Sequence, residues 1–455
     1  MTLKSPSLTR IPLPYAESSL GYFEAIRQLD KPILLDSSGN DRGRYDIISA
    51  KPTQCIALYA ASLPHFRVVF EKLRELSQHF VPIEAADLPF TGGLLGYVGY
   101  DVTHKKYALK DYSEAHSDND LPSVYFGAYG WAIIQDHKLK QCELIAHPAC
   151  KQTELEETLA IINSSLSSEP PSGESRDARS FQLSSEIQSN LNEAGYQEHF
   201  QKVQEYIRAG DCYQINLARR FSAAYLGDPF VAYRLLRTIA AAPYSAYIEF
   251  DDKAILSFSP ERFIRLDGTT VTTEPIKGTA ARSKNQNEDE ALAQSLLASE
   301  KNRAENLMIV DLLRNDLGQV CEAGSITVDK LFELQSFKTV HHLVSRISGE
   351  LRADEDAISL LAACFPGGSI TGAPKKRATE IIRELEPDAR DIFCGSIAMI
   401  SSNGKMDSNI AIRTITCANN QLHCWAGGGL VADSVAEDEF QETWHKVGKL
   451  LEALT

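Results

Sequence analysis

The chain switches repeatedly between two spacings of apolar residues, and this alternation constrains its fold more than any other feature. Apolar residues recur at helical spacing from Tyr196 to Ile207, stop at Gly210 and give way to a strand-like segment at 212–217. Further strand-like segments lie at 254–259, 393–401, 411–418 and 421–426. Further helical segments lie at 288–315, 374–386 and 433–454. A chain that mixes the two periods in this way is expected to fold as α/β or α+β.

One segment, 164–190, interrupts this pattern because it is rich in Ser, Pro and charged residues and has few apolar ones. We interpret it as a surface linker. It divides the chain into an N-terminal region, 1–163, and a larger C-terminal region, 191–455.

The charge balance excludes some partners. Lys and Arg number 46 against 61 Asp and Glu, a formal net charge of -15, which repels nucleic acid and anionic membrane surfaces at long range. We therefore expect no nucleic-acid or membrane partner. An anionic substrate would need a local source of positive charge, such as a metal ion, Arg, Lys or backbone N–H groups.

Cysteine usage and the apolar segments indicate a cytoplasmic protein. The nine cysteines form no C-x-x-C pair, so neither a disulfide framework nor a zinc site is expected. The first twenty residues lack the apolar core of a signal peptide, and the most apolar stretch, 124–134, is too short to span a bilayer.

The last helical segment carries two neighbouring faces. Its apolar stripe, Phe440 to Leu454, steps by four and three residues as in a buried helix face. Beside it, Glu439, Glu442 and Lys446 share one side. The sequence leaves two interpretations open: a solvated face with an i,i+4 ion pair, or a metal site beside an anion clamp.

Two glycine-rich segments argue against nucleotide binding. PGGSITGAPKK has the spacing of a phosphate loop, but Ala373 and Pro374 stand where Gly-Lys should follow. Pro374 instead fits the first residue of a helix, with Thr371 near its cap. WAGGGLVAD matches a dinucleotide fingerprint, but the acidic strand end expected about twenty residues later falls inside the last helix. The glycines at 427–429 could still let backbone N–H groups approach a ligand near the start of that helix, or form a tight turn with positive φ.

Seven segments together resemble the chorismate-utilising enzymes, which include anthranilate, aminodeoxychorismate, isochorismate and salicylate synthases. In the order of that family they are SPERF (259–263), PIKGT (275–279), ENLMIVDLLRND (305–316), HHLVS (341–345), PGGSITGAPKKRA (366–378), IRT (412–414) and GGGLVADSVAEDEFQET (427–443). LLDSS (34–38) and GGLLGY (92–97) resemble the N-terminal part of the ammonia-using members. The resemblance implies one α/β unit of two packed antiparallel sheets with helices outside, so that 164–190 becomes a surface excursion within it.

The same resemblance implies a site for chorismate, a dianion. Glu305, Glu439 and Glu442 would hold Mg²⁺, an ion suited to carboxylate oxygens and retained waters. Arg413 would fork onto the enolpyruvyl carboxylate and Lys446 would add a point charge. The remaining substrate-binding residues would be Gly278, Thr279, Ser369, Thr371, Gly427, Gly428 and Gly429.

Three further positions carry the expected chemistry. By resemblance, Glu261 is the proton donor to the departing 4-hydroxyl, which requires a carboxyl group that stays protonated near neutral pH. Lys277 matches members whose lysine attacks C2 of chorismate before ammonia adds at C4, whereas anthranilate-forming members typically carry a small residue there. His342 matches a residue near the ring hydroxyl, with His341 expected in packing or at the surface.

The neutral amide of Gln214 stands where the water-adding members have a lysine that acts as a base, which disfavours those members. No G-x-C-x-G nucleophile segment is present, so a separate glutamine amidotransferase is the expected partner and source of ammonia. The resemblance further implies a tryptophan pocket formed by Ser38, Arg44, Tyr45, Pro243, Tyr244 and Ser245, with Ser37 as the alternative to Ser38.

Three hypotheses follow. The expected function is synthesis of 4-amino-4-deoxychorismate from chorismate and ammonia, for 4-aminobenzoate and folate biosynthesis, through a covalent Lys277 intermediate. Anthranilate synthesis is the alternative, and a non-catalytic small-molecule-binding protein built on the same fold is the third.

Overall fold

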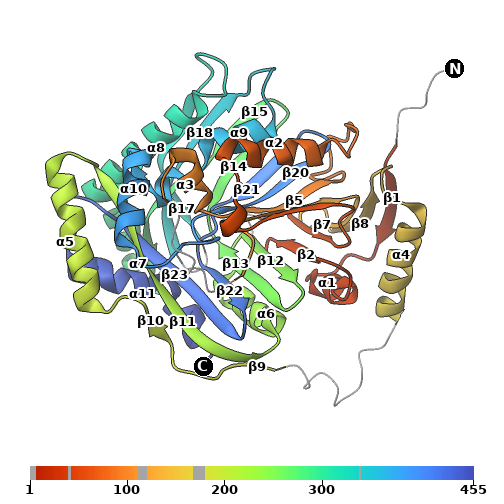
Figure 1. The fold of residues 1–455 in the computed structure, drawn as a ribbon, viewed down its shortest axis with the longest axis horizontal. Helices are drawn as coiled ribbons and strands as arrows, with labels where there is room; N and C mark the ends of the chain where they lie inside the picture. The colour runs from red at the N-terminus through yellow and green to blue at the C-terminus, as the bar shows by residue number, and fades with distance from the viewer. Residues whose placement is uncertain (1–6, 39–42, 111–119, 168–179, 338–339) are drawn as a thin grey trace.

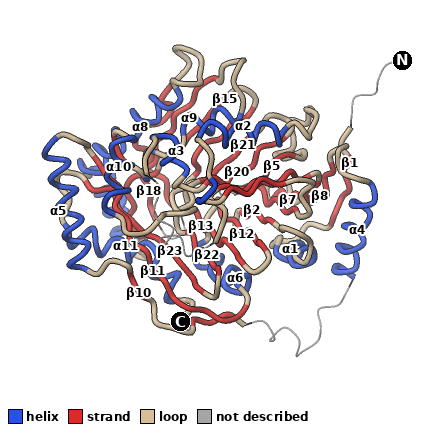
Figure 2. The backbone as a smooth tube through the Cα atoms, in the orientation of Figure 1, coloured by secondary structure: helices blue, strands red, loops and turns tan. Residues whose placement is uncertain are grey.

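A computed structural model describes residues 7–38, 43–110, 120–167, 180–337 and 340–455 (Figures 1 and 2). Residues 168–179 of the predicted excursion lie outside the described residues, while its end forms two short strands, β9 (Phe181–Leu183) and β10 (Gln188–Ser189). No helix in the described ranges is both long and apolar enough to cross a bilayer.

Two large antiparallel sheets form the centre of the molecule (Figure 1). The first sheet has the spatial order β1 (Thr9–Leu13), β8 (Gln141–Ala146), β7 (Trp131–Asp136), β3 (Tyr45–Ser49), β2 (Ile33–Asp36), β12 (Tyr244–Phe250), β13 (Lys253–Ser259), β22 (Thr414–Ala418), β23 (Gln421–Leu430), β11 (Gln214–Gly227) and β10, with β9 and β19 (Gly372–Ala373) paired to β11. The second has the order β16 (Ile276–Ala281), β18 (Val340–Glu350), β15 (Thr270–Thr273), β14 (Arg262–Asp267), β21 (Met406–Asn409), β20 (Ser396–Ser401), β5 (Gly93–Val98), β6 (Val124–Tyr129) and β4 (Cys55–Leu58), with β17 (Thr327–Ser336) paired to β18.

Helices cover the outer faces of both sheets (Figure 2). On the first sheet lie α1 (Leu20–Ile26), α4 (Gln152–Ser167), α6 (Pro229–Ala240) and α11 (Ala436–Glu452). The other helices are α2 (Phe66–Ser77), α3 (Val102–Tyr107), α5 (Glu193–Ala209), α7 (Gln286–Ala298), α8 (Glu300–Leu317), α9 (Ala357–Cys364) and α10 (Lys375–Leu385), with short 3-10 turns η1 (Ala60–Ser62) and η4 (Gly368–Ile370).

Side-chain alternation explains why the sheets pack in layers. In β13, Leu256 and Phe258 face the helices, whereas Ile255 faces the other sheet. In β5, Leu94 joins the core beneath the outer helices and Leu95 joins the core between the sheets. Because successive strand residues point to opposite faces, each such strand contributes to two apolar layers.

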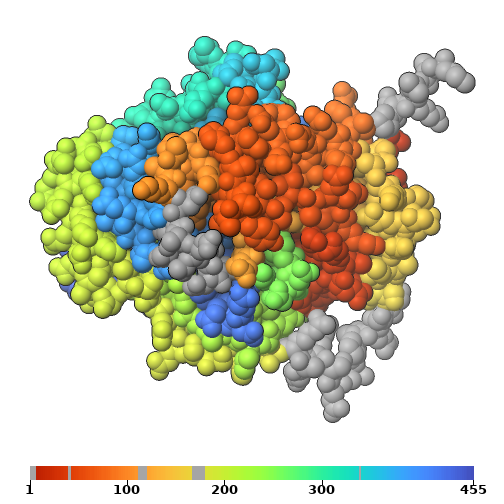
Figure 3. All heavy atoms as spheres, viewed as in Figure 1, coloured from red at the N-terminus to blue at the C-terminus, as the bar shows by residue number. Residues whose placement is uncertain are grey.

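The N- and C-terminal regions share both sheets. β2 pairs with β12, and β5 pairs with β20. On the face shown in Figure 3, N-terminal residues, red to orange, lie directly against C-terminal segments in blue. The predicted fold of two packed antiparallel sheets with outer helices is therefore confirmed, while the boundaries 1–163, 164–190 and 191–455 remain a prediction.

Apolar periodicity and capping residues in the sequence predicted most helices correctly but missed some of their ends. Gly210 ends α5 in the left-handed conformation, as its position predicts. The segment 288–315 is two helices rather than one, because Ser299 has an extended backbone and its side chain caps α8. Pro374 lies just before α10, which begins at Lys375, and no side chain caps that helix.

Candidate active site

The predicted site residues lie on segments that converge from different parts of the chain. β23 contacts α11 and η4, and α8 contacts β16 and η4. Lys277 belongs to β16, Ser369 to η4 and Glu305 to α8. The structure therefore brings together side chains that are as much as 92 residues apart in the sequence.

Lys277 lies inside this group. Its Nζ donates to the backbone carbonyl of Ser369 at 3.2 Å. Burial lowers the pKa of the ammonium, with a further contribution from Lys446, while Glu305 and Glu261 oppose the shift. A lysine in such surroundings has a larger fraction of neutral, nucleophilic amine than a lysine in water.

Glu261 lies in the connection between β13 and β14 and is buried. Its backbone is fixed on both sides, because Ser259 Oγ accepts from the Glu261 N–H and Glu261 O accepts from Ile410 N at 3.1 Å. Its Oε1 accepts a hydrogen bond from Ser369 Oγ at 3.0 Å. Burial raises the pKa of this carboxyl to about 6, although Lys277 opposes the shift. The group can therefore hold a proton near neutral pH, as a general acid requires.

The three predicted metal ligands lie on two helices. On α11, Glu439 is buried and accepts from Ser434 Oγ at 2.7 Å, and its Oε1 lies 3.5 Å from Lys301 Nζ. Glu442 forms an exposed ion pair with Lys446 at 2.6 Å. On α8, no hydrogen bond or ion pair to another described residue engages the Glu305 carboxylate. Burial raises the pKa of Glu305, and Glu439 and Glu442 raise it further.

These carboxylates fit a cation that keeps some of its waters. Among the described residues, no three His, Cys, Asp or Glu side chains form a complete metal cage. Mg²⁺ usually binds only one or two carboxylates, together with waters and substrate oxygens. Burial raises the pKa of Glu305, and repulsion from Glu439 and Glu442 raises it further; a bound divalent cation would relieve that repulsion. The exposed i,i+4 pair of Glu442 and Lys446 agrees with the solvated-face interpretation, whereas the metal site on the same face of α11 remains a prediction.

The glycines at 427–429 lie within β23 and not in a turn at the start of α11, which begins at Ala436. None of the three has positive φ, so the tight-turn interpretation is wrong. They are needed for close approach instead. A Cβ on Gly428 would lie 2.8 Å from Glu439 Oε2, and one on Gly429 would lie 2.4 Å from Gln214 Nε2. Lys446 Nζ donates to the carbonyl of Gly427 at 2.7 Å.

Arg413 provides positive charge that the described protein does not neutralise. It precedes β22 with a left-handed backbone, φ 51°, and its carbonyl accepts from Phe258 N at 3.0 Å. Burial lowers the pKa of its guanidinium. No carboxylate in the described ranges forms an ion pair with it. An unpaired guanidinium in a partly buried position is suited to an anionic ligand.

The remaining predicted residues surround this centre. Thr279 Oγ1 and His342 Nδ1 are 2.8 Å apart across paired strands β16 and β18. Gly278 has φ 81°, and a Cβ there would lie 2.9 Å from Asn302 Cγ. Thr371 is buried and donates to the carbonyl of Gly367 at 2.8 Å. His341 is buried, and its Nε2 lies 3.1 Å from Asp289 Oδ1 of α7.

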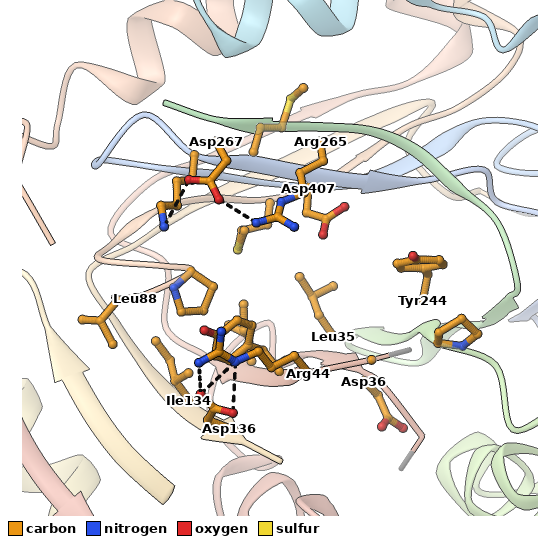
Figure 4. Close-up of a pocket in the computed structure, with 18 of the residues that line it drawn as sticks. Leu35, Asp36, Arg44, Leu88, Ile134, Asp136, Tyr244, Arg265, Asp267 and Asp407 are labelled. Carbon is orange, nitrogen blue, oxygen red and sulfur yellow. Dashed lines mark hydrogen bonds and ion pairs between the residues drawn. The ribbon is translucent and has the colours of Figure 1, made fainter. Parts of the chain in front are cut away.

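A separate cavity of about 460 Å³ lies between the two sheets (Figure 4). Arg44 stacks on Tyr45 at 4.6 Å and pairs with Asp136 at 2.7 Å on one wall. The lining of the cavity includes the predicted pocket residues Arg44, Tyr45, Pro243, Tyr244 and Ser245. Neither Lys277 nor Glu261 lines this cavity.

Ser38 adjoins the cavity rather than lining it. Its Oγ donates to Ser245 Oγ at 3.1 Å, whereas Ser37 Oγ donates to the buried carboxylate of Asp46 at 2.6 Å. The carboxylate of Asp36 points away from the cavity, as Figure 4 shows, and binds Arg237 of α6. The geometry thus favours Ser38 over Ser37 as a pocket residue.

Some contacts of the site had no sequence signal. Ser369 contacts both Glu261 and Lys277, and Lys301 and Ser434 contact Glu439. These residues are far from their partners in the sequence or lie in irregular segments, so periodicity gives no indication of the contacts.

Comparisons with a family model and with known proteins point to the same family. Residues 31–452 match the family model described as chorismate binding enzyme. The curated protein "Aminodeoxychorismate synthase component 1" of Escherichia coli (strain K12) is 43% identical over 446 residues, 95% of each chain. The protein of the same name from Bacillus subtilis (strain 168) is 33% identical over 100% of this chain and 98% of that one. "Anthranilate synthase component 1" of Aquifex aeolicus (strain VF5) is 35% identical over 84% of this chain and 78% of that one.

Solved structures agree on the fold. Anthranilate synthase component I from Streptococcus pneumoniae TIGR4 superposes with a TM-score of 0.79 at 32% identity, covering 90% of this chain and 92% of that one. The menaquinone-specific isochorismate synthase from Escherichia coli superposes with a TM-score of 0.75 at 19% identity, covering 99% and 95%. The second likeness concerns the fold alone.

The unpaired charge of Arg413 predicts a conflict between stability and ligand binding. Arg413→Met removes a desolvated guanidinium with no carboxylate partner, so the ligand-free protein should become more stable by about 1 kcal/mol. Urea unfolding without ligand measures this change. The matched control is Arg237→Met, which breaks a buried pair with Asp36 and should destabilise by about 3–5 kcal/mol. Equal destabilisation by both substitutions would contradict the assignment of Arg413 as an unpaired cation.

Proposed function

Because this chain belongs to the family of chorismate binding enzymes, we propose that it converts chorismate and ammonia to 4-amino-4-deoxychorismate. Relatives named aminodeoxychorismate synthase component 1 are 33–43% identical over nearly the whole chain. One observation carries the proposal: the Lys277 amine and the Glu261 carboxyl group both form hydrogen bonds with the same residue, Ser369. Anthranilate synthesis is the alternative activity, named for relatives that cover less of the chain.

Arg413 and the backbone of β23 are the proposed anchors of chorismate. The substrate carries two carboxylates, and the chain as a whole is acidic, so capture depends on local charge. Arg413 can pair with one carboxylate in a bidentate manner. The ammonium of Lys446, held at the Gly427 carbonyl, adds a second charge beside the glycine run.

Glu305, Glu439 and Glu442 would hold Mg²⁺. When bound, the ion would neutralise the second substrate carboxylate and the mutual repulsion of these three side chains. Lys301, which lies 3.5 Å from Glu439 and is about half exposed, balances that carboxylate in the described structure.

Lys277 and Glu261 divide the chemistry of the first step. The neutral Lys277 amine forms a bond to C2, the two ring double bonds shift, and the C4–O bond breaks. Glu261 gives its proton to the departing oxygen, which leaves as water, and the alkylated amine later loses a proton. Ammonia then adds at C4 and the double bonds shift back. The C2–N bond to Lys277 breaks as that nitrogen regains a proton, and the new C4 ammonium gives up one proton, which leaves a free lysine amine and a C4 amine. The sum is replacement of a hydroxyl group by an amine.

Ammonia is proposed to come from a glutamine amidotransferase subunit. The relatives' names describe a first component, which implies at least one other. We also propose a cytoplasmic location, in keeping with nine free cysteines, of which only Cys55 is exposed.

The cavity between the sheets is proposed to bind tryptophan. The lining includes apolar residues such as Leu35 and Ile134. It also includes two charged pairs, Arg44 with Asp136 and Arg265 with Asp267, which lie on opposite sides of the cavity in Figure 4. Such walls suit a ligand with an apolar ring and a zwitterionic end.

The function is tested by incubating the purified chain with chorismate, Mg²⁺ and ammonium, then adding the lyase that releases pyruvate. We expect 4-aminobenzoate only after the lyase is added. Anthranilate appearing without the lyase would establish the alternative activity. No turnover would support the third hypothesis, a non-catalytic small-molecule-binding protein.

The covalent step is tested by intact mass. Wild-type protein trapped with chorismate and Mg²⁺ without ammonia should gain the mass of chorismate less one water, on the 275–279 peptide. Lys277→Ala should show no adduct and should aminate more slowly, on the order of 10²-fold or more. Lys202→Ala, which removes an exposed lysine of α5, is the matched control and should keep the adduct. Amination by Lys277→Ala at the wild-type rate would exclude covalent catalysis.

Tryptophan binding is tested by thermal unfolding. At about 100 times Kd a ligand stabilises a protein by about 2.7 kcal/mol, so L-tryptophan but not L-alanine should raise Tm. Tyr244→Ala, which removes an aromatic wall of the cavity, should abolish the rise. Tyr213→Ala, which removes an exposed tyrosine elsewhere, should keep it. A Tm that does not respond to L-tryptophan in wild type, once any co-purified ligand has been dialysed away, would refute the proposal.

A further inference from the structure

Ser369 contacts both reacting side chains with two different atoms. Its hydroxyl donates to Glu261 Oε1 at 3.0 Å, and its backbone carbonyl accepts from Lys277 Nζ at 3.2 Å. The side chain is buried, with 8% of its surface exposed. Its hydroxyl and its carbonyl thus both bond to reacting side chains, while the substrate-binding role that the resemblance implies for Ser369 remains a prediction.

The polarity of these two bonds favours one arrangement of protons. A hydroxyl that donates to a carboxyl group stabilises the ionised carboxylate, and a carbonyl that accepts from an amine stabilises the ammonium. The proposed reaction needs the opposite arrangement, a protonated Glu261 and a neutral Lys277. Both arrangements carry the same single proton, so pH sets the number of protons on the pair and the surroundings set where the proton resides.

We propose that Ser369 is a positioning residue that holds Glu261 as a carboxylate and Lys277 as an ammonium in the resting protein, and that it sets the pH at which the pair gains its second proton. The inference rests on the proposed function, because it assigns Ser369 to the same two reacting groups. In the resting protein the Lys277 amine donates a hydrogen bond to the Ser369 carbonyl. The amine must break this bond before it can attack C2 of the substrate.

The segment that carries Ser369 is fixed from several sides, as a positioning role requires. The carbonyl of Ile370 accepts from Arg390 Nη1 at 3.1 Å, and Arg390 is fully buried against Glu386. Gly368 packs so closely on α8 that a Cβ there would lie 2.3 Å from Leu312 Cδ2. The hydroxyl and the carbonyl of Ser369 therefore have little freedom to move away from their partners.

Other charged groups also face Glu261 and Lys277. Glu261 faces Lys277 from β16 and Lys446 from α11, accepts from the Ile276 backbone N–H and influences Cys394 before β20. Lys277 faces Glu305 from α8 and Glu442 from α11. Burial is the largest influence on both groups and favours their neutral forms, so it acts against Ser369. Substituting Ser369 leaves all of these groups in place.

The test is the pH profile of kcat/KM for chorismate at saturating Mg²⁺ and ammonium. In wild type we expect activity to rise with pH as the doubly protonated pair loses one proton near pH 6, where the pKa of Glu261 lies. Without the hydroxyl the carboxylate is less stable, so the pair keeps its second proton to higher pH. Ser369→Ala should move this acid limb upward by about one pH unit.

Two further variants keep the test decisive. Ser369→Cys, which nearly keeps the volume and has a weaker donor, should move the limb in the same direction by less, and it serves if the alanine variant does not fold. The control is Ser396→Ala, which also removes a buried serine hydroxyl, one that donates to the backbone carbonyl of Asn409. This variant should leave the acid limb at the wild-type pH. A limb that stays at the wild-type pH in both Ser369 variants overturns the inference, as does an equal shift in Ser396→Ala. If wild type itself produces no 4-amino-4-deoxychorismate, it is the proposed function that has failed.

Discussion

The contact between the glycine run of β23 and the acidic face of α11 is the steric constraint on which the site depends. A methyl group at Gly428 would meet the Glu439 carboxylate at 2.8 Å, so this carboxylate can lie where it does because the strand has no side chain there. The same closeness lets Lys446 reach the Gly427 carbonyl. Once α11 is held there, its carboxylates lie near Glu305 of α8, and electrostatic repulsion between them favours a cation.

Sequence reasoning located the parts of the fold where local chemistry decides the structure. The apolar stripe of the last helix is buried at Val447 and Leu451, and the expected strands at 254–259 and 421–426 are β13 and β23. It failed where tertiary contacts decide. The glycine run fits a turn by composition, but its pairing with β11 makes it a strand. The break at Ser299 depends on one capping side chain inside a segment that otherwise has helical periodicity throughout.

The site itself divides in the same way. The identities of Lys277, Glu261 and the three acidic residues came from motif resemblance, which records residue types and their order along the chain. The role of Ser369 could not come from that source, because it depends on the direction of two hydrogen bonds between segments more than ninety residues apart. Nor could the lack of a carboxylate partner for Arg413 among the described residues, since such a lack is visible only when the neighbours are known.

The two sites of the molecule meet at one short segment. Glu261 and Arg262 are adjacent in sequence, and adjacent side chains of an extended backbone point to opposite sides. Glu261 contacts Ser369 of the reacting centre, whereas Arg262 lines the cavity between the sheets, pairs with Asp407 and lies 5.0 Å from the ring of Tyr244. A ligand that packs against Tyr244 would also restrict the backbone that carries the acid. A ligand in the cavity would thus act on the hydrogen bond between Glu261 and Ser369 without entering the reacting centre.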